Sequence, residues 1–188
     1  NRKIDSPEAL TLGRPPWRVG LVRGPKWSYA EKYAQDAILN FASEIDRIDG
    51  IEVKELELPD IFSRAHEVHD IIYSRMLSYY FEEESKQFDK LSKVFQEMIV
   101  RGNRFTLKDY REGLAFQDDL VDTTERMFDD VDVILNLSSG GEAMVGLETP
   151  DRPDNCLIWT FARVPALGVP AFQGPLKLPF GAQLVARR

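Results

Sequence analysis

The sequence has 188 residues, 43% of them hydrophobic and 29% charged, which is ordinary for a folded globular protein and excludes disordered, collagen-like and coiled-coil chains. A chain of this length can build one well-cored domain, so we expect a single domain over residues 1–188. The net charge is −7 and no basic cluster is interleaved with aromatic residues, which weighs against a nucleic-acid partner.

The sequence also bears on the compartment. No stretch approaches the roughly 18 consecutive apolar residues of a membrane-spanning helix, and residues 1–12 lack the basic and apolar segments of a secretion signal. Cys156 is the single cysteine, so an intrachain disulfide is excluded and we expect a packing residue in a reducing compartment. We therefore predict a cytoplasmic protein with no membrane partner.

The first part of the chain predicts a β-α-β unit. Arg18–Val22 is a short, apolar, strand-forming run. Apolar residues between 29 and 48 then recur at helical spacing, with Ser28 as the expected amino-terminal cap and Glu31 completing a capping-box pattern. Ile51–Leu58 alternates apolar and charged residues as a strand does, so we expect parallel pairing of the two strands through a right-handed crossover.

The middle of the chain predicts a helical insertion at about residues 60–130. This segment has no proline and only two glycines, and its pattern indicates three helices, over 60–81, 84–100 and 107–128. Thr106 is placed to cap the third helix, with Asp109 at its third position.

The last part predicts further strands. Val133–Leu135 is an apolar strand, and Ser138–Asn155 carries turn residues throughout, as a long functional loop does. A short helix over 155–162 then leads into two apolar runs, Val164–Pro170 and Leu178–Arg187, which we expect to be two buried strands. The elements together predict an α/β fold with a mixed sheet flanked by helices.

The exact amino-acid sequences of the two final strands are more informative than their pattern of apolar residues. The first contains Pro-Ala-Leu-Gly-Val-Pro, and the second reads Leu-Pro-Phe-Gly-Ala-Gln-Leu-Val-Ala-Arg. This pair resembles the carboxy-terminal strand pair of the amidase signature family, which hydrolyses or transfers the nitrogen of carboxamides with a Ser-Ser-Lys triad. The match extends over about residues 130–188 and is looser over residues 16–58.

The resemblance implies that the chain is the carboxy-terminal, substrate-pocket-shaping part of an amide hydrolase, without the Ser-Ser-Lys triad. It implies a small-molecule amide substrate for the parent enzyme, no cofactor, no metal and no catalytic residue in this chain, while the substrate-binding residues stay undetermined. A sheet cut in this way exposes strand edges, which predicts a homo-oligomer. The alternative is a non-catalytic binding or interaction module that retains the amidase fold.

Two adjacent serines are the first candidate for chemistry. Ser138-Ser139-Gly140-Gly141 resembles the nucleophile loop of the amidase family, but it directly follows a strand and lies only about thirty residues before the final strand pair. No lysine lies in a suitable upstream motif, since Lys26 and Lys108 have unrelated contexts, and a serine without a base is a weak nucleophile. We therefore expect a structural glycine turn.

Other polar candidates are weaker. His66 and His69 are three residues apart, whereas the zinc-protease motif spaces its histidines four apart, so we expect a solvated helix face there with one histidine partly packed. The acidic runs Glu82–Glu84 and Asp118-Asp119 are expected on exposed helix ends and faces.

Two further groups have both a structural and a binding interpretation. Met76, Tyr79, Tyr80 and Phe81 could line an apolar pocket, but their helical spacing favours core packing. Gln183 stands among apolar neighbours in a strand, so we expect its amide to hydrogen-bond a neighbouring loop, with a binding role as the second interpretation.

Overall fold

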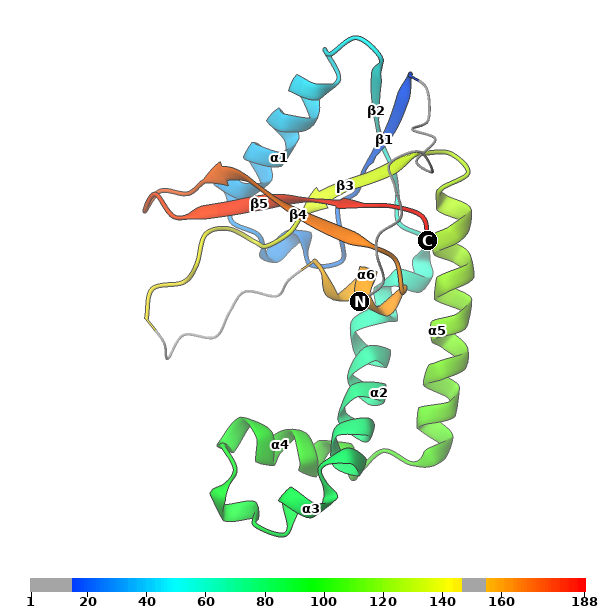
Figure 1. Ribbon diagram of the computed structural model, residues 1–188, viewed down its shortest axis with the longest axis vertical. Helices are drawn as coiled ribbons and strands as arrows, with labels where there is room; N and C mark the ends of the chain where they lie inside the picture. The colour runs from blue at the N-terminus through cyan, green and yellow to red at the C-terminus, as the bar shows by residue number, and fades with distance from the viewer. Residues whose placement is uncertain (1–14, 147–154) are drawn as a thin grey trace, which may run out of the picture.

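The computed structural model describes residues 15–146 and 155–188. It contains one five-stranded mixed sheet with the strand order β2-β1-β3-β5-β4, flanked by helices (Figure 1). The fold is therefore α/β, as the sequence predicts. In the described part of the chain, no helix combines the length and apolarity needed to cross a membrane.

The amino-terminal β-α-β unit forms as expected. β1 (Trp17–Leu21) pairs in parallel with β2 (Ile51–Glu55), and α1 (Lys32–Ile45) connects them. The prediction of Ser28 as the cap is wrong, because a 3₁₀ turn occupies Trp27–Tyr29 and the helix begins only after two extended residues.

The helical segment between β2 and β3 departs more from the prediction. After a 3₁₀ turn, α2 (Ala65–Tyr80) and α5 (Leu107–Met127) run side by side away from the sheet, and α3 (Glu82–Ser85) and α4 (Lys93–Gly102) lie at the far end (Figure 1). The predicted helix over 84–100 is wrong in its first half, because Ser92 caps a helix that begins at Lys93. The capping box of Thr106 and Asp109 is confirmed.

The carboxy-terminal strands complete the sheet. β3 (Val133–Leu137) pairs in parallel with β1 and antiparallel with β5 (Pro179–Val185), which pairs antiparallel with the edge strand β4 (Ala166–Gln173). A short helix, α6 (Leu157–Phe161), precedes β4. The predicted burial is confirmed for β5 but wrong for β4, whose side chains are mostly exposed because no strand or helix within residues 15–146 and 155–188 covers this edge.

The two faces of the sheet carry different layers. On the covered face, α2, α5 and α6 bury one core against the strands, and Ile134 and Trp159 are fully buried there. On the open face, α1 packs against the sheet, and its apolar side predicted from the sequence contacts β1, β3 and β5. Beside α1 this face has a groove of about 360 Å³, lined by residues such as Phe41, Val133 and Leu184.

Candidate functional site

The loop after β3 begins where the chain connections of the sheet reverse direction. β1 lies between β2 and β3: the connection through α1 leads from β1 to β2 on one side, and the connection through α2 and α5 leads from β2 back past β1 to β3 on its other side. In α/β sheets, ligands bind beside the carboxyl ends of the strands at such a switch point. Ser138 follows β3 at this position, and the carbonyl of Gly140 accepts a 2.8 Å hydrogen bond from the backbone of Glu31, just before α1. Topology therefore makes the 138–142 loop the leading candidate site.

The two serines of this loop have their hydroxyls turned to the backbone. Ser138 Oγ donates to the carbonyl of Gly181 at 2.8 Å, and Ser139 Oγ donates to the carbonyl of Gly141 at 2.9 Å. The two lysines considered from the sequence lie in other interactions: Lys26 Nζ is 5.4 Å from the ring centre of Tyr29, and Lys108 pairs with Glu112 at 3.7 Å. Backbone hydrogen bonds of this kind fix a turn and do not activate a nucleophile.

Glu142 connects the loop to the β4–β5 hairpin. The residue is 5% exposed, and its carboxylate accepts hydrogen bonds from the backbone amides of Leu176, at 2.9 and 3.1 Å, and Leu178, at 3.1 Å. Its own backbone amide donates to the hydroxyl of Tyr33 on α1 at 2.9 Å. Glu142 thus fixes three elements relative to one another. Apolar periodicity predicts Tyr33 on the packed side of α1, but it gives no signal for the hydrogen bond of its hydroxyl or for the role of Glu142.

A buried polar cluster lies behind the loop, on the covered face of the sheet. Asn136 and Gln183 are opposite each other in the β3–β5 register and are 1% and 5% exposed. Gln183 Nε2 donates to Cys156 Sγ at 3.1 Å, and Cys156 Sγ donates to the carbonyl of Ser138 at 3.3 Å. The expected hydrogen bond from Gln183 to a neighbouring segment is therefore present, and Cys156 has a polar contact as well as a packing role.

Several buried polar atoms of β3, β5 and the α6 segment lack hydrogen-bond partners within the described residues. They are both amide atoms of Asn136, Oε1 of Gln183, Oδ1 of Asn155 and Nε1 of Trp159. Unsatisfied buried polar atoms are costly, and folded proteins retain few of them. Asn136 and Gln183, which lie opposite each other near the start of the 138–142 loop, contribute three of these five atoms.

The histidines lie away from this loop. The ring of His69 stacks on Tyr73, with 5.6 Å between ring centres, and meets Phe161 edge-on at 5.8 Å. Among the residues that the structure describes, no three His, Cys, Asp or Glu side chains are arranged to hold a metal ion. The absence of a metal site stays a prediction for the whole protein.

The acidic candidates occupy helix surfaces. Glu82–Glu84 form the exposed α3, and Asp118 on α5 pairs with Arg163 at 3.1 Å. The residues of both groups are exposed, as expected for helix ends and faces.

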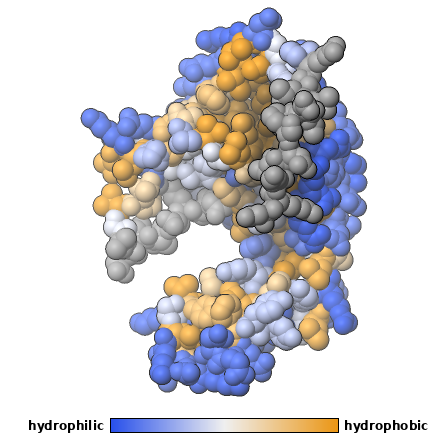
Figure 2. Space-filling model, viewed as in Figure 1, coloured by the Kyte–Doolittle hydropathy of each residue, from blue (hydrophilic) through white to orange (hydrophobic). Residues whose placement is uncertain are grey.

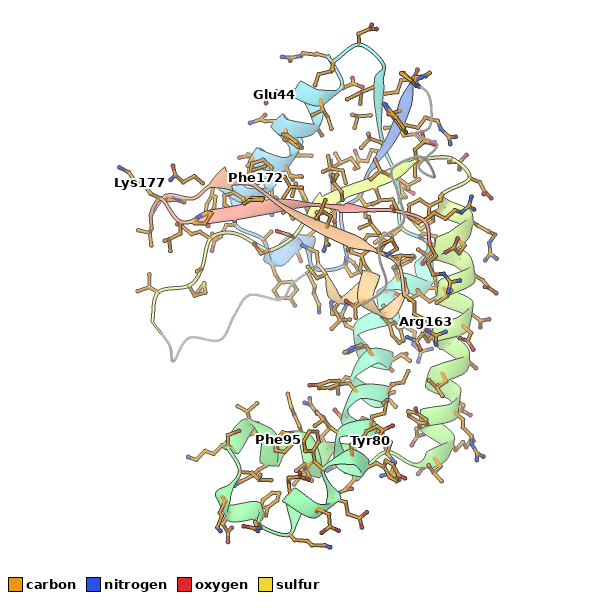
Figure 3. The ribbon with its side chains drawn as sticks, viewed as in Figure 1. Glu44, Tyr80, Phe95, Arg163, Phe172 and Lys177 are labelled. Atoms are coloured by element: carbon orange, nitrogen blue, oxygen red, sulfur yellow. The ribbon has the colours of Figure 1, made fainter. Side chains whose placement is uncertain are left out.

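The aromatic group on α2 does not form part of the core. Tyr79 and Tyr80 are 67% and 68% exposed, and Met76 and Phe81 also lie at the surface, which makes the core-packing prediction wrong. Tyr80 lies at the end of α2 farthest from the sheet, with Phe95 on α4 nearby (Figure 3). Met76, Tyr79 and Tyr80 instead line a pocket, as the second interpretation had it.

The chain shares its fold with part of several solved enzymes. The chain superposes on the crystal structure of an amidase with a TM-score of 0.81 and 20% sequence identity, covering 93% of this chain and 42% of the amidase. A bacterial aryl acylamidase of the amidase signature family gives a TM-score of 0.69 at 16% identity, covering 96% of this chain and 42% of that enzyme. A 6-aminohexanoate cyclic dimer hydrolase with bound substrate gives 0.71 at 15% identity, covering 97% and 42%.

These similarities have two limits. At such identities they show a shared fold, and the chain spans about two fifths of the length of these enzymes. No model of a known protein family matches the sequence, and no curated protein sequence matches it.

Proposed function

We propose that this chain is the carboxy-terminal, pocket-shaping part of an amide hydrolase of the amidase signature type. The observation that carries the proposal is the fold: 93% of the chain superposes on an amidase at a TM-score of 0.81 while covering 42% of it. The amino-acid sequences of β4 and β5 support the proposal independently, because they resemble the final strand pair of that family.

In the proposed enzyme, the nucleophilic serine and the lysine lie outside this chain. The serine oxygen attacks the carboxamide carbon, the C–N bond breaks, and the amine leaves with a proton. Water then cleaves the acyl-enzyme, and backbone amides stabilise the oxyanion. The hydroxyls of Ser138 and Ser139 donate hydrogen bonds to backbone carbonyls, which supports a role for the 138–142 loop in shaping the pocket rather than in nucleophilic attack.

An activity assay of the 188-residue chain tests this assignment of roles. Against a panel of small amides and esters, we expect no turnover above that of the heat-treated chain. The variants Ser138→Ala and Ser139→Ala, measured alongside, are expected to behave as the unmodified chain does. Turnover that Ser139→Ala or Ser138→Ala abolishes would place the nucleophile in this loop and overturn the proposal.

The proposal also predicts self-association of the isolated chain. The groove beside α1 and the exposed edge of β4 are surfaces that the remainder of an amidase would cover. Figure 2 shows apolar surface near the strands in the upper part of the view. We expect light scattering to give a molar mass above 21.5 kDa that rises with concentration. A constant monomer mass at high concentration would contradict this prediction.

A further inference from the structure

The far end of the helical extension contains a small pocket that is separate from the 138–142 loop. It lies between the last turns of α2 and the first turn of α5 and has a volume of about 220 Å³. Its walls combine one cationic side chain with aromatic and apolar ones, contributed by Arg75, Met76, Tyr79, Tyr80, Leu107 and Tyr110. Figure 3 shows Tyr80 at this end of the molecule.

Arg75 supplies the positive charge of this pocket. Arg75 is half-buried, and Nη1 makes a 3.4 Å hydrogen bond to the hydroxyl of Ser78. Within the described residues, the Arg75 guanidinium forms no ion pair, whereas the nearby Arg101 pairs with Asp70. A guanidinium that is partly withdrawn from water retains donors suited to a planar anion, because its fork matches a carboxylate with two parallel hydrogen bonds.

The apolar wall suits a ring. Tyr79 and Tyr80 meet edge-to-face with 5.4 Å between ring centres, and Met76 and Leu107 add apolar contacts at the surface. Aromatic and methionine side chains pack favourably against a ring. An aromatic cage alone would attract a cation, but the charge of Arg75 opposes one.

We propose that this pocket binds a small aromatic monocarboxylate, with the carboxylate on Arg75 and the ring against Met76 and the tyrosines. The volume of about 220 Å³ limits the ligand to a single ring with a short substituent, since pockets for drug-sized ligands begin at about 300 Å³. The acidic α3 follows α2 directly, so the attraction depends on contact with Arg75 and not on the long-range field. The inference stands independently of the amide-hydrolase proposal.

Methyl NMR of the 188-residue chain tests this site with benzoate as the probe. The chain has four methionines, so a spectrum labelled at the methionine methyl groups contains one signal from the pocket, Met76, and three from elsewhere. We expect benzoate to shift the Met76 signal to saturation while Met98, Met127 and Met144 stay in place. Benzamide has the same ring without the charge, and it should bind at least tenfold more weakly, because a charge-assisted bidentate contact is lost.

Two variants separate binding from folding. Arg75→Gln should weaken benzoate binding about tenfold or more, while Arg47→Gln, an exposed arginine at the other end of the molecule, should leave it unchanged. Leu107→Glu introduces a repelling carboxylate at the first position of α5, where an acidic residue favours the helix, and should weaken binding without unfolding. An unshifted signal of the buried Met127 verifies the fold in each variant.

Three results would overturn the proposal. The first is a Met76 shift that does not saturate, or that spreads equally to the other methionines. The second is benzamide binding as tightly as benzoate. The third is unchanged benzoate binding by a folded Arg75→Gln or Leu107→Glu variant.

Discussion

The two faces of the sheet are covered to different extents by the same chain. On the covered face, three helices enclose the strands, and Ile134, Ile158 and Trp159 have no measurable exposure. On the open face, α1 packs beside a groove of about 360 Å³, and the neighbouring edge strand β4 is mostly exposed. An apolar strand sequence therefore indicates that a face can be buried, while the helices that pack on the sheet decide which strands are buried.

The largest expected effect tests this difference with two adjacent residues of β3. Ile134 faces the buried core, and Val133 lines the groove on the other face. We expect Ile134→Ala to lower the free energy of unfolding by about 2–5 kcal/mol, because it leaves a cavity. Val133→Ala should cost below about 1.5 kcal/mol, since its side chain already contacts solvent. Urea denaturation measures both.

A similar loss for the two variants would show that the open face is as tightly packed as the covered one. The comparison between the faces would then fail, and with it the argument that the groove needs a cover outside this chain.

The next effect concerns the hydrogen bonds by which the Glu142 carboxylate holds the β4–β5 hairpin. Glu142→Gln replaces one carboxylate oxygen by a donor facing the amides of Leu176 and Leu178, so we expect a loss of about 2 kcal/mol in urea denaturation. Hydrogen exchange of those two amides should accelerate more than that of β3. Glu112→Gln, on an exposed helix face, is the matched control and should stay within about 0.5 kcal/mol. Unchanged hydrogen exchange of the Leu176 and Leu178 amides in Glu142→Gln would show that the carboxylate does not hold the hairpin.

A smaller effect tests whether the helical extension depends on local capping. The hydroxyl of Thr106 accepts from the amide of Asp109 at 3.1 Å, at the start of α5. We expect Thr106→Ala to lower the free energy of unfolding by about 1 kcal/mol, while Thr106→Ser keeps the cap and most of the stability. Thermal denaturation of the three proteins measures this, and equal stability of the alanine and serine variants would contradict it.

The smallest effect is a pH dependence at Asp132, just before β3. The side chain of Arg18 hydrogen-bonds Asp132 at 2.8 Å, and with the Arg18 backbone amide it lowers the pKa of that carboxyl. A lowered folded-state pKa adds stability that is present above the unfolded value of about 3.9 and is lost as the pH falls through the folded value. Asp132→Asn should therefore be slightly less stable than the unmodified chain at pH 7.

At low pH the two proteins should converge in urea midpoint. The exposed Asp119 on α5 provides the control, because Asp119→Asn removes a carboxylate that does not pair with Arg18 and should not reproduce this convergence. The measurements cover pH 3–7, a range that includes the unfolded pKa of about 3.9. A difference in urea midpoint between Asp132→Asn and the unmodified chain that stays constant over this range would contradict a stabilising role for the ionised Asp132.

Local patterns predict those parts of the fold that depend on local contacts. The alternation in Ile51–Glu55 and the apolar side of α1 follow from the burial of one face, and Thr106 caps α5 because its partner is three residues away. The start of α4 was missed because the absence of proline permits a helix over 84–92 without requiring one, and Ser92 sets the boundary.

Patterns fail where the outcome depends on what covers a surface. The spacing of Met76, Tyr79 and Tyr80 indicates one apolar side of α2, but it carries no information on whether another element packs there. The apolar composition of β4 misleads in the same way. At the candidate site, the turn formed by Ser138 and Ser139 was predictable from the glycines, whereas the contacts of Glu142 join residues far apart in sequence.

Labelling with a fluorophosphonate, which reacts with activated serines, tests the central claim most directly. The probe is applied to the native polypeptide that contains this sequence, and the labelled peptide is identified by mass spectrometry. The account predicts one labelled serine outside residues 1–188. A label on Ser138 or Ser139 would contradict it, and a folded polypeptide without any label would favour a binding module over an amide hydrolase.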